Sequence, residues 1–233
     1  MRLFCLPYAG GSAAIYRQLP RLLPDIEVRA IELPGRGSRL RERAHDSMDR
    51  LVETLLHELR GSFDEPFAFL GHSMGASISF ELACRLPEHA RVNLKHLFLS
   101  ARAAPGMPRG MRALHELDDA EFKKGLRELN GTRHSILDLD EVMDLMMPAL
   151  RADFTLIERY DPTLNRCIPV NITAFAGTQD TAVKVESVVA WKQATSREFE
   201  LMLIEGGHFY LEKAMPTLAN AITARLGAPS GFL

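Results

Sequence analysis

A serine between two glycines is the strongest chemical signal in the sequence. The pentapeptide GHSMG at residues 71–75 follows the apolar run 67–70 and precedes a segment with helical spacing, 74–86. A tight turn from a strand into a helix requires small residues two positions before and after the serine, because side chains there would collide with the strand and the helix. This arrangement is typical of a nucleophile elbow, which exposes a serine hydroxyl near a helix N-terminus. We therefore predict that Ser73 is a nucleophile.

A serine hydroxyl needs a histidine base and a carboxylate that orients the base, in the chain order Ser, Asp or Glu, His. His208 follows the apolar run 199–204, and Asp180 lies in the loop after the run 172–176. Both loops should lie with the elbow at the carboxyl edge of a parallel sheet. We predict that His208 is the base and Asp180 the carboxylate. The competing side chains are less well placed: His72, His89, His96, His115 and His134 for the base; Asp153 first, then Asp138, Asp140, Asp144 and Asp161, for the carboxylate.

Two backbone N–H groups must stabilise the oxyanion that forms when a serine attacks a carbonyl. One belongs to the residue after the nucleophile, here Met74. The second is expected from the glycine-containing loop 7–11, with Ala9 as the first choice and Tyr8 as the alternative. Without the serine, this loop would be interpreted as a simple glycine turn before a helix. A phosphate site is less favoured, because the sequence lacks GxGxxG and no Gly-Lys-Ser/Thr follows.

Strand-like and helix-like segments alternate along the chain, which predicts an α/β fold with a mostly parallel sheet covered by helices on both faces. We interpret residues 1–233 as one domain. The expected strands are 3–6, 28–33, 67–70, 94–99, 172–176 and 199–204. The expected helices are 12–23, 47–59, 74–86, 183–193 and 211–226.

An insert of about seventy residues interrupts this alternation between the fourth and fifth strands, several times the usual length of a connection. Residues 118–130 and 141–160 predict helices within it, the second kinked or divided by Pro148. Five methionines lie in or beside the insert, and flexible side chains of this kind suit an apolar substrate cavity. They line such a cavity, pack the insert onto the body, or do both: Met107, Met111, Met143, Met146 and Met147.

The overall composition excludes several other classes of function. The 233 residues are 46% hydrophobic, and a net charge of −2 gives no reason to expect binding to nucleic acid or to an anionic membrane. No apolar run is long enough to span a bilayer. The cysteines Cys5, Cys84 and Cys167 have no metal-site spacing and are interpreted as free thiols in a reducing compartment. We expect a cytoplasmic monomer that needs neither a metal nor an organic cofactor.

Six short motifs together resemble those of a known family. The chain carries PYAGGS at 7–12, LPGR at 33–36, GHSMGA at 71–76, FEL at 80–82, LRAD at 150–153 and GHF at 207–209. Their kind and order are similar to those of type II thioesterases, which are stand-alone α/β-hydrolases that accompany nonribosomal peptide and polyketide synthases. The sequence departs from the family pattern at Ala101, where glycine is common, and at Leu70, where phenylalanine is usual.

The resemblance implies an α/β-hydrolase fold with a helical lid over residues 107–160 and a triad at Ser73, Asp180 and His208. It also implies a reaction in which acyl groups are hydrolysed from the phosphopantetheine thiol of carrier proteins, clearing stalled or misprimed synthases. The chain has no predicted strand before residue 3, so the sheet is expected to be smaller than the full hydrolase sheet.

Two other classes of function remain open from the sequence. A general serine esterase or an acyltransferase could use the same fold and triad. A hydrolase-fold protein without activity could act as a binding partner, although such proteins often lose a triad member. The arginines after the second strand could contact an acidic carrier protein or its phosphate, but a solvated, salt-bridged face is the favoured interpretation: Arg36, Arg39, Arg41 and Arg43.

Overall fold

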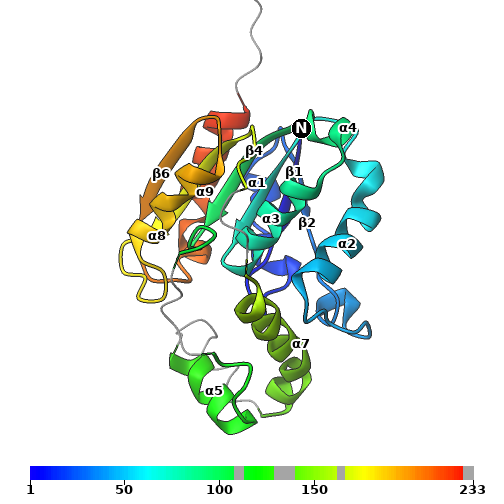
Figure 1. Ribbon diagram of the computed structural model, residues 1–233, viewed down its shortest axis with the longest axis vertical. Coiled ribbons are helices and arrows are strands. Elements are labelled where there is room, and N and C mark those ends of the chain that lie inside the picture. The colour runs from blue at the N-terminus through cyan, green and yellow to red at the C-terminus, as the bar shows by residue number, and fades with distance from the viewer. Residues whose placement is uncertain (108–112, 129–139, 162–165, 228–233) are drawn as a thin grey trace, which may run out of the picture.

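A six-stranded sheet lies at the centre of the computed structural model, which describes residues 1–107, 113–128, 140–161 and 166–227 (Figure 1). Its strands are β1 (Arg2–Leu6), β2 (Glu27–Ala30), β3 (Phe67–His72), β4 (Leu94–Ser100), β5 (Asn171–Gly177) and β6 (Phe199–Ile204). They lie in the order β2-β1-β3-β4-β5-β6, and every neighbouring pair is parallel. The expected α/β architecture is confirmed, and β3, which leads into the elbow, occupies an inner position.

Helices cover both faces of the sheet. On one face lie α2 (Met48–Leu59), α3 (Met74–Arg85) and α8 (Val185–Val189), and on the other lie α1 (Leu19–Leu22) and α9 (Leu211–Leu226). The side chains of β3 alternate between the two cores: Phe67 and Phe69 pack on the α3 side, while Ala68 and Leu70 pack on the α9 side. Because successive strand residues point to opposite faces, a strand buried on both sides is a continuous apolar run.

Three elements differ from the expected ranges. In place of a helix over 12–23, the chain forms a 3-10 turn at Ala13–Tyr16 and the short helix α1, because Pro20 has no N–H to continue a helical ladder. The helix expected over 183–193 is divided into α8 and a 3-10 segment at Ala190–Ala194. The second strand is shorter than expected because its pairing with β1 ends at Ala30. A further helical turn, α4 (Glu88–Arg91), precedes β4.

The insert contributes two described helices, α5 (Asp119–Glu128) and α7 (Asp140–Arg159), which lie together at one end of the molecule (Figure 1). Pro148 lies inside α7, which is a single helix. At the start of α5, the Asp118 carboxylate accepts the Glu121 N–H at 2.9 Å. The expected end of this helix, at residues 130–131, lies outside the described residues. The two helices enclose a small hydrophobic core of their own: Leu114, Phe122, Leu126, Met143, Met147, Leu150 and Phe154.

A buried carboxylate connects the end of the insert to α3. Glu81 on α3 accepts hydrogen bonds from the Tyr160 hydroxyl and from both terminal nitrogens of Arg166, and its side chain is fully buried. Burial would raise the pKa of Glu81, but the hydrogen bonds and charge of Arg166 and the hydroxyl of Tyr160 lower it. The carboxylate is therefore charged, and it fixes the segment after α7 to the helix that follows the elbow.

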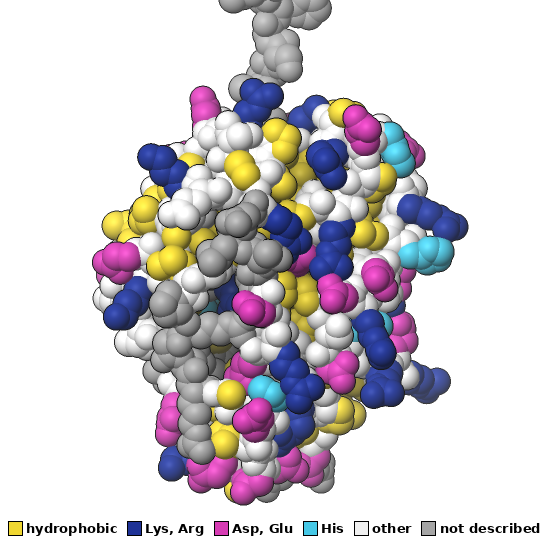
Figure 2. Space-filling view, viewed as in Figure 1, with side chains coloured by type: hydrophobic (Ala, Val, Ile, Leu, Met, Phe, Trp, Pro, Cys, Tyr) yellow, Lys and Arg dark blue, Asp and Glu magenta, His cyan; other side chains and the backbone are white. Residues whose placement is uncertain are grey.

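Charges of both signs are intermixed on the surface. Figure 2 shows lysine and arginine side chains interspersed with aspartate and glutamate over the face in view, without a large area of one sign. Among the described helices, none is both long enough and apolar enough to cross a membrane.

Candidate active site

Ser73 lies in a strained turn between β3 and α3. Its backbone has φ 52° and ψ −114°, a conformation that L-residues rarely adopt. A Cβ atom at residue 71 would lie 2.1 Å from the Gly75 carbonyl oxygen, and one at residue 75 would lie 2.1 Å from the Leu6 carbonyl oxygen. Both positions therefore require glycine, for the steric reason expected of a nucleophile elbow. The Ser73 N–H donates to the Ser100 carbonyl at 2.8 Å, which ties the turn to the end of β4.

The structure brings Ser73, His208 and Asp180 together. The Nε2 atom of His208 lies 2.9 Å from Ser73 Oγ, and its Nδ1 atom lies 2.8 Å from Asp180 Oδ2. With Nδ1 protonated and donating to the carboxylate, Nε2 is free to accept the serine proton. The three side chains follow β3, β5 and β6, so the parallel sheet places them at one edge. This is the arrangement expected from the sequence.

The environment of Asp180 keeps its carboxylate charged. The side chain is 1% exposed, and this burial would raise its pKa. The hydrogen bond and charge of His208 oppose that effect, as do the N–H groups of Val183 and Ala182, which donate to Asp180 Oδ1 at 2.9 and 2.8 Å. The net result is a lowered pKa, so Asp180 can orient the imidazole and stabilise the imidazolium that forms when His208 takes a proton.

A chain of buried polar groups contacts the backbone of His208. His72 Nε2 donates to the His208 carbonyl at 2.9 Å, and His72 Nδ1 lies 2.8 Å from Ser100 Oγ. Ser100 Oγ in turn lies 2.6 Å from the Tyr210 hydroxyl. Burial lowers the pKa of His72 to about 3, so this imidazole is neutral and belongs to the scaffold rather than to the proton transfer. The sequence pattern contains no signal for this network and indicates only that His72 is less well placed than His208 to act as the base.

Lowering the pH below about 6.5 is expected to destabilise the protein through two buried histidines. Burial lowers the pKa of His72 to about 3, and burial together with the charge of Arg225 lowers that of His96 to about 4. The unfolded chain binds these protons near pH 6.5 and the folded chain does not, so stability is full above that pH and falls by about 1.4 kcal/mol per pH unit for each group. Urea unfolding at pH 6.0, 5.0 and 4.5 measures the free energy of unfolding at each pH. This free energy should fall less steeply with decreasing pH in His72→Gln than in wild type.

The control for loss of a histidine is the exposed His89→Gln on α4. An identical pH slope for His72→Gln and wild type would contradict the assignment of a neutral, buried His72.

The two predicted oxyanion donors, Met74 and Ala9, border the same cavity as Ser73. Met74 is the first residue of α3, and N–H groups in the first turn of a helix have no partner within the helix. Ala9, in the loop after β1, borders the same cavity as Ser73, and no acceptor for its N–H lies among the described residues. The next two N–H groups of this loop are occupied: Gly10 donates to Asp153 Oδ2 at 2.7 Å, and Gly11 donates to the Tyr8 carbonyl at 2.9 Å.

A cavity of about 830 Å³ adjoins the triad. Ser73 and His208 lie in its wall. Loops after the strands, parts of α3 and α8, and one side of α7 with Phe154 and Ile157 also contribute to the wall. This volume falls in the range of small-molecule sites. Apolar side chains such as Trp191 occupy much of the wall.

The expectation that the methionines line this cavity holds for one of them, Met107. Met143 and Met147 are buried in the core that α7 forms with α5, and Met146 packs against that core. The lining role is therefore wrong for these three, because α7 turns their stripe of side chains toward α5 and presents later residues to the cavity. Met111 lies outside the described residues.

The rival candidates for the base and the carboxylate lie elsewhere. Asp153 forms a bidentate ion pair with Arg36 and does not contact His208. The others are dispersed: His96 contacts Thr173, His115 contacts Glu158, His89 is exposed, Asp144 pairs with Lys123, and Asp161 borders the cavity. His134 and Asp138 lie outside the described residues, as does the side chain of Asp140.

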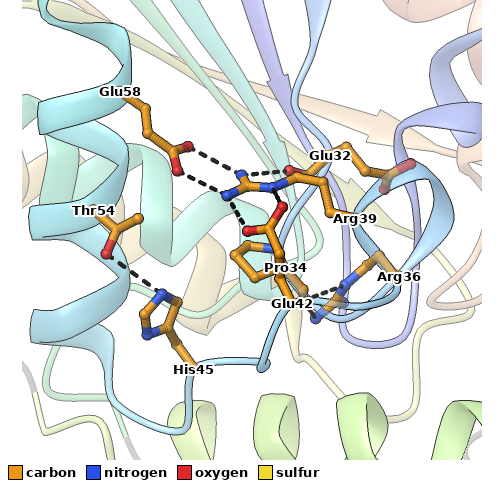
Figure 3. Close-up of polar contacts among 8 residues, drawn as sticks. All are labelled: Glu32, Pro34, Arg36, Arg39, Glu42, His45, Thr54 and Glu58. Carbon is orange, nitrogen blue, oxygen red and sulfur yellow. Dashed lines mark hydrogen bonds and ion pairs between the residues drawn. The ribbon is translucent and has the colours of Figure 1, made fainter.

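Two of the four arginines considered for a carrier contact are already occupied. Arg39 is held by the carboxylates of Glu42 and Glu58 at 2.6 and 2.7 Å, whereas the Arg36 guanidinium turns away from this group toward Pro34 (Figure 3). Arg36 is buried, which corrects the idea that it forms part of an exposed docking patch. The salt-bridged interpretation describes Arg39, and Arg41 and Arg43 are exposed.

A metal centre has no donor set in the part of the chain that is described. No group of three or more His, Cys, Asp and Glu side chains is arranged there to hold an ion. The three cysteines are free.

Comparisons with known proteins identify the family of the chain. The Thioesterase domain family matches residues 1–226. The Gramicidin S biosynthesis protein GrsT of Aneurinibacillus migulanus is 42% identical over 212 residues, which cover 91% of this chain and 83% of GrsT. RedJ, a thioesterase from the prodiginine pathway of Streptomyces coelicolor, superposes with a TM-score of 0.88 at 35% identity, covering 97% of this chain and 85% of RedJ. The type II thioesterase BorB from the borrelidin biosynthetic cluster gives a TM-score of 0.88 at 36% identity, covering 97% and 92%. The chain therefore belongs to the thioesterase family and is a hydrolase that acts on thioesters.

Proposed function

We propose that the protein hydrolyses acyl groups from the phosphopantetheine thiol of carrier proteins, and so removes aberrant or stalled acyl units from a peptide or polyketide synthase. The observation that carries this proposal is the hydrogen-bonded series from Ser73 Oγ through His208 to Asp180, at the wall of a largely apolar cavity. The relatives add support for the pathway, because GrsT is named for gramicidin S biosynthesis and BorB is the type II thioesterase of the borrelidin biosynthetic cluster.

The first half of the reaction forms an acyl-serine. His208 Nε2 takes the proton of Ser73 Oγ while the oxygen attacks the thioester carbonyl, and the oxyanion accepts hydrogen bonds from the N–H groups of Met74 and Ala9. The C–S bond then breaks, and the proton on His208 passes to the leaving pantetheine sulfur.

The second half releases the acyl group. A water molecule gives its proton to His208 Nε2 and attacks the acyl-serine carbonyl, again with the oxyanion held by the two N–H groups. The bond to Ser73 Oγ breaks, and His208 returns the proton to the serine. The products are a carboxylic acid and free enzyme, so no oxidant, metal or organic cofactor takes part in any step.

The insert would act as the lid of this site over residues 107–160. Its helix α7 supplies Phe154 and Ile157 to the wall of the cavity, and Met107, at the start of the insert, also lines it. An acyl chain between these side chains and Trp191 would be shielded from bulk water while the thioester lies at Ser73. The pantetheine arm would then reach the site from outside, with the carrier protein at the surface.

The decisive experiment compares substrates rather than variants. Wild-type protein should release the acyl group from acyl-phosphopantetheinyl carrier protein with a higher kcat/KM than from the matching p-nitrophenyl ester. Hydrolysis of the oxygen ester alone would make this a general esterase and overturn the proposal. Transfer of the acyl group to an added alcohol or amine, in place of acid release, would instead identify an acyltransferase.

A fluorophosphonate probe separates an enzyme from an inactive binding protein. Covalent labelling of wild type that is lost in Ser73→Ala supports a reactive serine, and absence of labelling in folded wild-type protein would favour the binding protein.

A further inference from the structure

The carboxylate of Asp153 joins three segments that are distant in the sequence. It lies on α7, and its Oδ2 atom accepts the Gly10 N–H at 2.7 Å. Arg36, in the loop after β2, donates to Asp153 Oδ2 at 2.5 Å and to Oδ1 at 2.7 Å. The side chain of Asp153 is 2% exposed and that of Arg36 is 9% exposed. Arg36 also donates to the carbonyls of Gly11 and Pro34, so the ion pair lies between the insert, the loop after β1 and the loop after β2.

We infer that Asp153, held by the Arg36 guanidinium, is a positioning residue. Through Gly10 it holds in place the loop after β1, residues 7–11, which we call the oxyanion loop. This inference rests on the proposed function, in which Ala9 supplies the second oxyanion N–H. The peptide unit that carries the Gly10 N–H is also the one that contains the Ala9 carbonyl, so a hydrogen bond to that unit fixes the orientation of the backbone on the C-terminal side of Ala9. The direction of the neighbouring Ala9 N–H is set by the same short segment.

Packing adds a second, independent contact between this loop and α7. Gly10 has φ 74°, and a Cβ atom there would lie 2.4 Å from Leu150 Cδ2. Leu150 is one helical turn before Asp153, so α7 meets the loop through an apolar contact and a charged hydrogen bond on the same side. Phe154, the next residue of α7, borders the cavity. One turn of α7 therefore both holds the oxyanion loop and forms part of the cavity wall.

The charge of Asp153 suits this task better than a neutral acceptor would. Hydrogen bonds to a carboxylate are stronger than bonds between neutral groups, and the effect is larger in a buried position. The planar guanidinium of Arg36 binds both oxygens and so fixes the plane of the carboxylate, leaving Oδ2 directed at Gly10. Neither side chain borders the cavity, so the pair acts on the reaction through the backbone and not by touching substrate.

The test removes the pair without leaving a buried charge alone. In the double variant Arg36→Met/Asp153→Leu, both charges are replaced by apolar side chains of similar size, which folded proteins often tolerate. The Gly10 N–H then has no carboxylate acceptor. We expect kcat on acyl carrier protein to fall about 10- to 100-fold with KM within about 3-fold, since the loss of one oxyanion donor lowers kcat by about 10²–10³. Arg39→Met is the matched control on the same loop and should keep the wild-type kcat.

A trifluoromethyl ketone that forms an oxyanion adduct with Ser73 provides a second readout, independent of the carrier protein. Its affinity should fall in the double variant by the same factor as kcat/KM, whereas a general loss of packing would not produce that agreement. Wild-type kcat and inhibitor affinity in the folded double variant would overturn the inference. If the double variant does not fold, kcat and inhibitor affinity are measured for Asp153→Asn instead. Wild-type values of both in that variant would also overturn the inference. The wild-type protein could bind the inhibitor tightly and yet fail to hydrolyse carrier thioesters. That result would refute the proposed substrate but would not affect the positioning role of Asp153.

Discussion

Replacing Ser73 by alanine is expected to lower kcat for thioester hydrolysis by about 10⁴- to 10⁶-fold, because the acyl-enzyme can no longer form and only binding and the oxyanion donors remain. The variant should fold normally, since alanine fits the space that serine occupies in the turn. KM should change little if the serine hydroxyl contributes mainly to the transition state. Single-turnover hydrolysis of an acyl carrier protein, followed by mass of the carrier, measures the loss and detects any acyl-serine.

The matched control is Ser196→Ala, which removes an exposed hydroxyl just before β6 and should leave kcat unchanged. Activity within tenfold of wild type in a pure preparation of Ser73→Ala would show that Ser73 is not the nucleophile, whatever its geometry.

Changing Asp180 to asparagine is expected to lower kcat by about 10⁴-fold, the size of the effect that the equivalent change has in serine proteases. An amide can present its NH₂ group to His208 Nδ1, which favours the tautomer with the proton on Nε2 and leaves that nitrogen unable to accept from Ser73. The amide oxygen can still accept the N–H groups of Ala182 and Val183, so the loop should keep its shape. Steady-state kinetics on the carrier thioester, with a melting curve as a check of folding, measures the effect.

Asp161→Asn provides the comparison for Asp180, because Asp161 also borders the cavity but makes no contact with His208 among those described. A smaller loss for Asp180→Asn than for Asp161→Asn would contradict the assigned role.

The grouping of Ser73, Asp180 and His208 was predictable from the sequence because Ser73 directly follows a strand and the other two lie in the loops after strands. Apolar runs identify strands well, and the carboxyl ends of parallel strands lie at one edge, so Ser73, Asp180 and His208 could be placed together without knowledge of packing. The loop after β1 was expected at the same edge, and Ala9 in that loop borders the cavity with Ser73.

Features that depend on how distant segments pack could not be predicted. The ion pair between Arg36 and Asp153 joins residues 117 positions apart, and nothing in the spacing of either motif shows that α7 reaches the loop after β2. Met143 and Met147 are four residues apart and so lie on one side of α7, but nothing in that spacing shows that this side faces α5 instead of the cavity. The period identifies an apolar face, and only the tertiary structure shows what covers it.

The position of β6 has a consequence for how the protein loses activity. This strand is at the edge of the sheet, it pairs with β5 alone, and of its six residues only Ile204 is buried. Edge segments with few buried side chains open locally at a lower free energy than inner strands such as β3. His208 follows β6, while Ser73 follows β3. We therefore expect the triad to come apart by fraying from the His208 side, so that mild denaturant inactivates the protein before its core melts, and amide hydrogens of β6 exchange with solvent sooner than those of the strand that leads to the nucleophile.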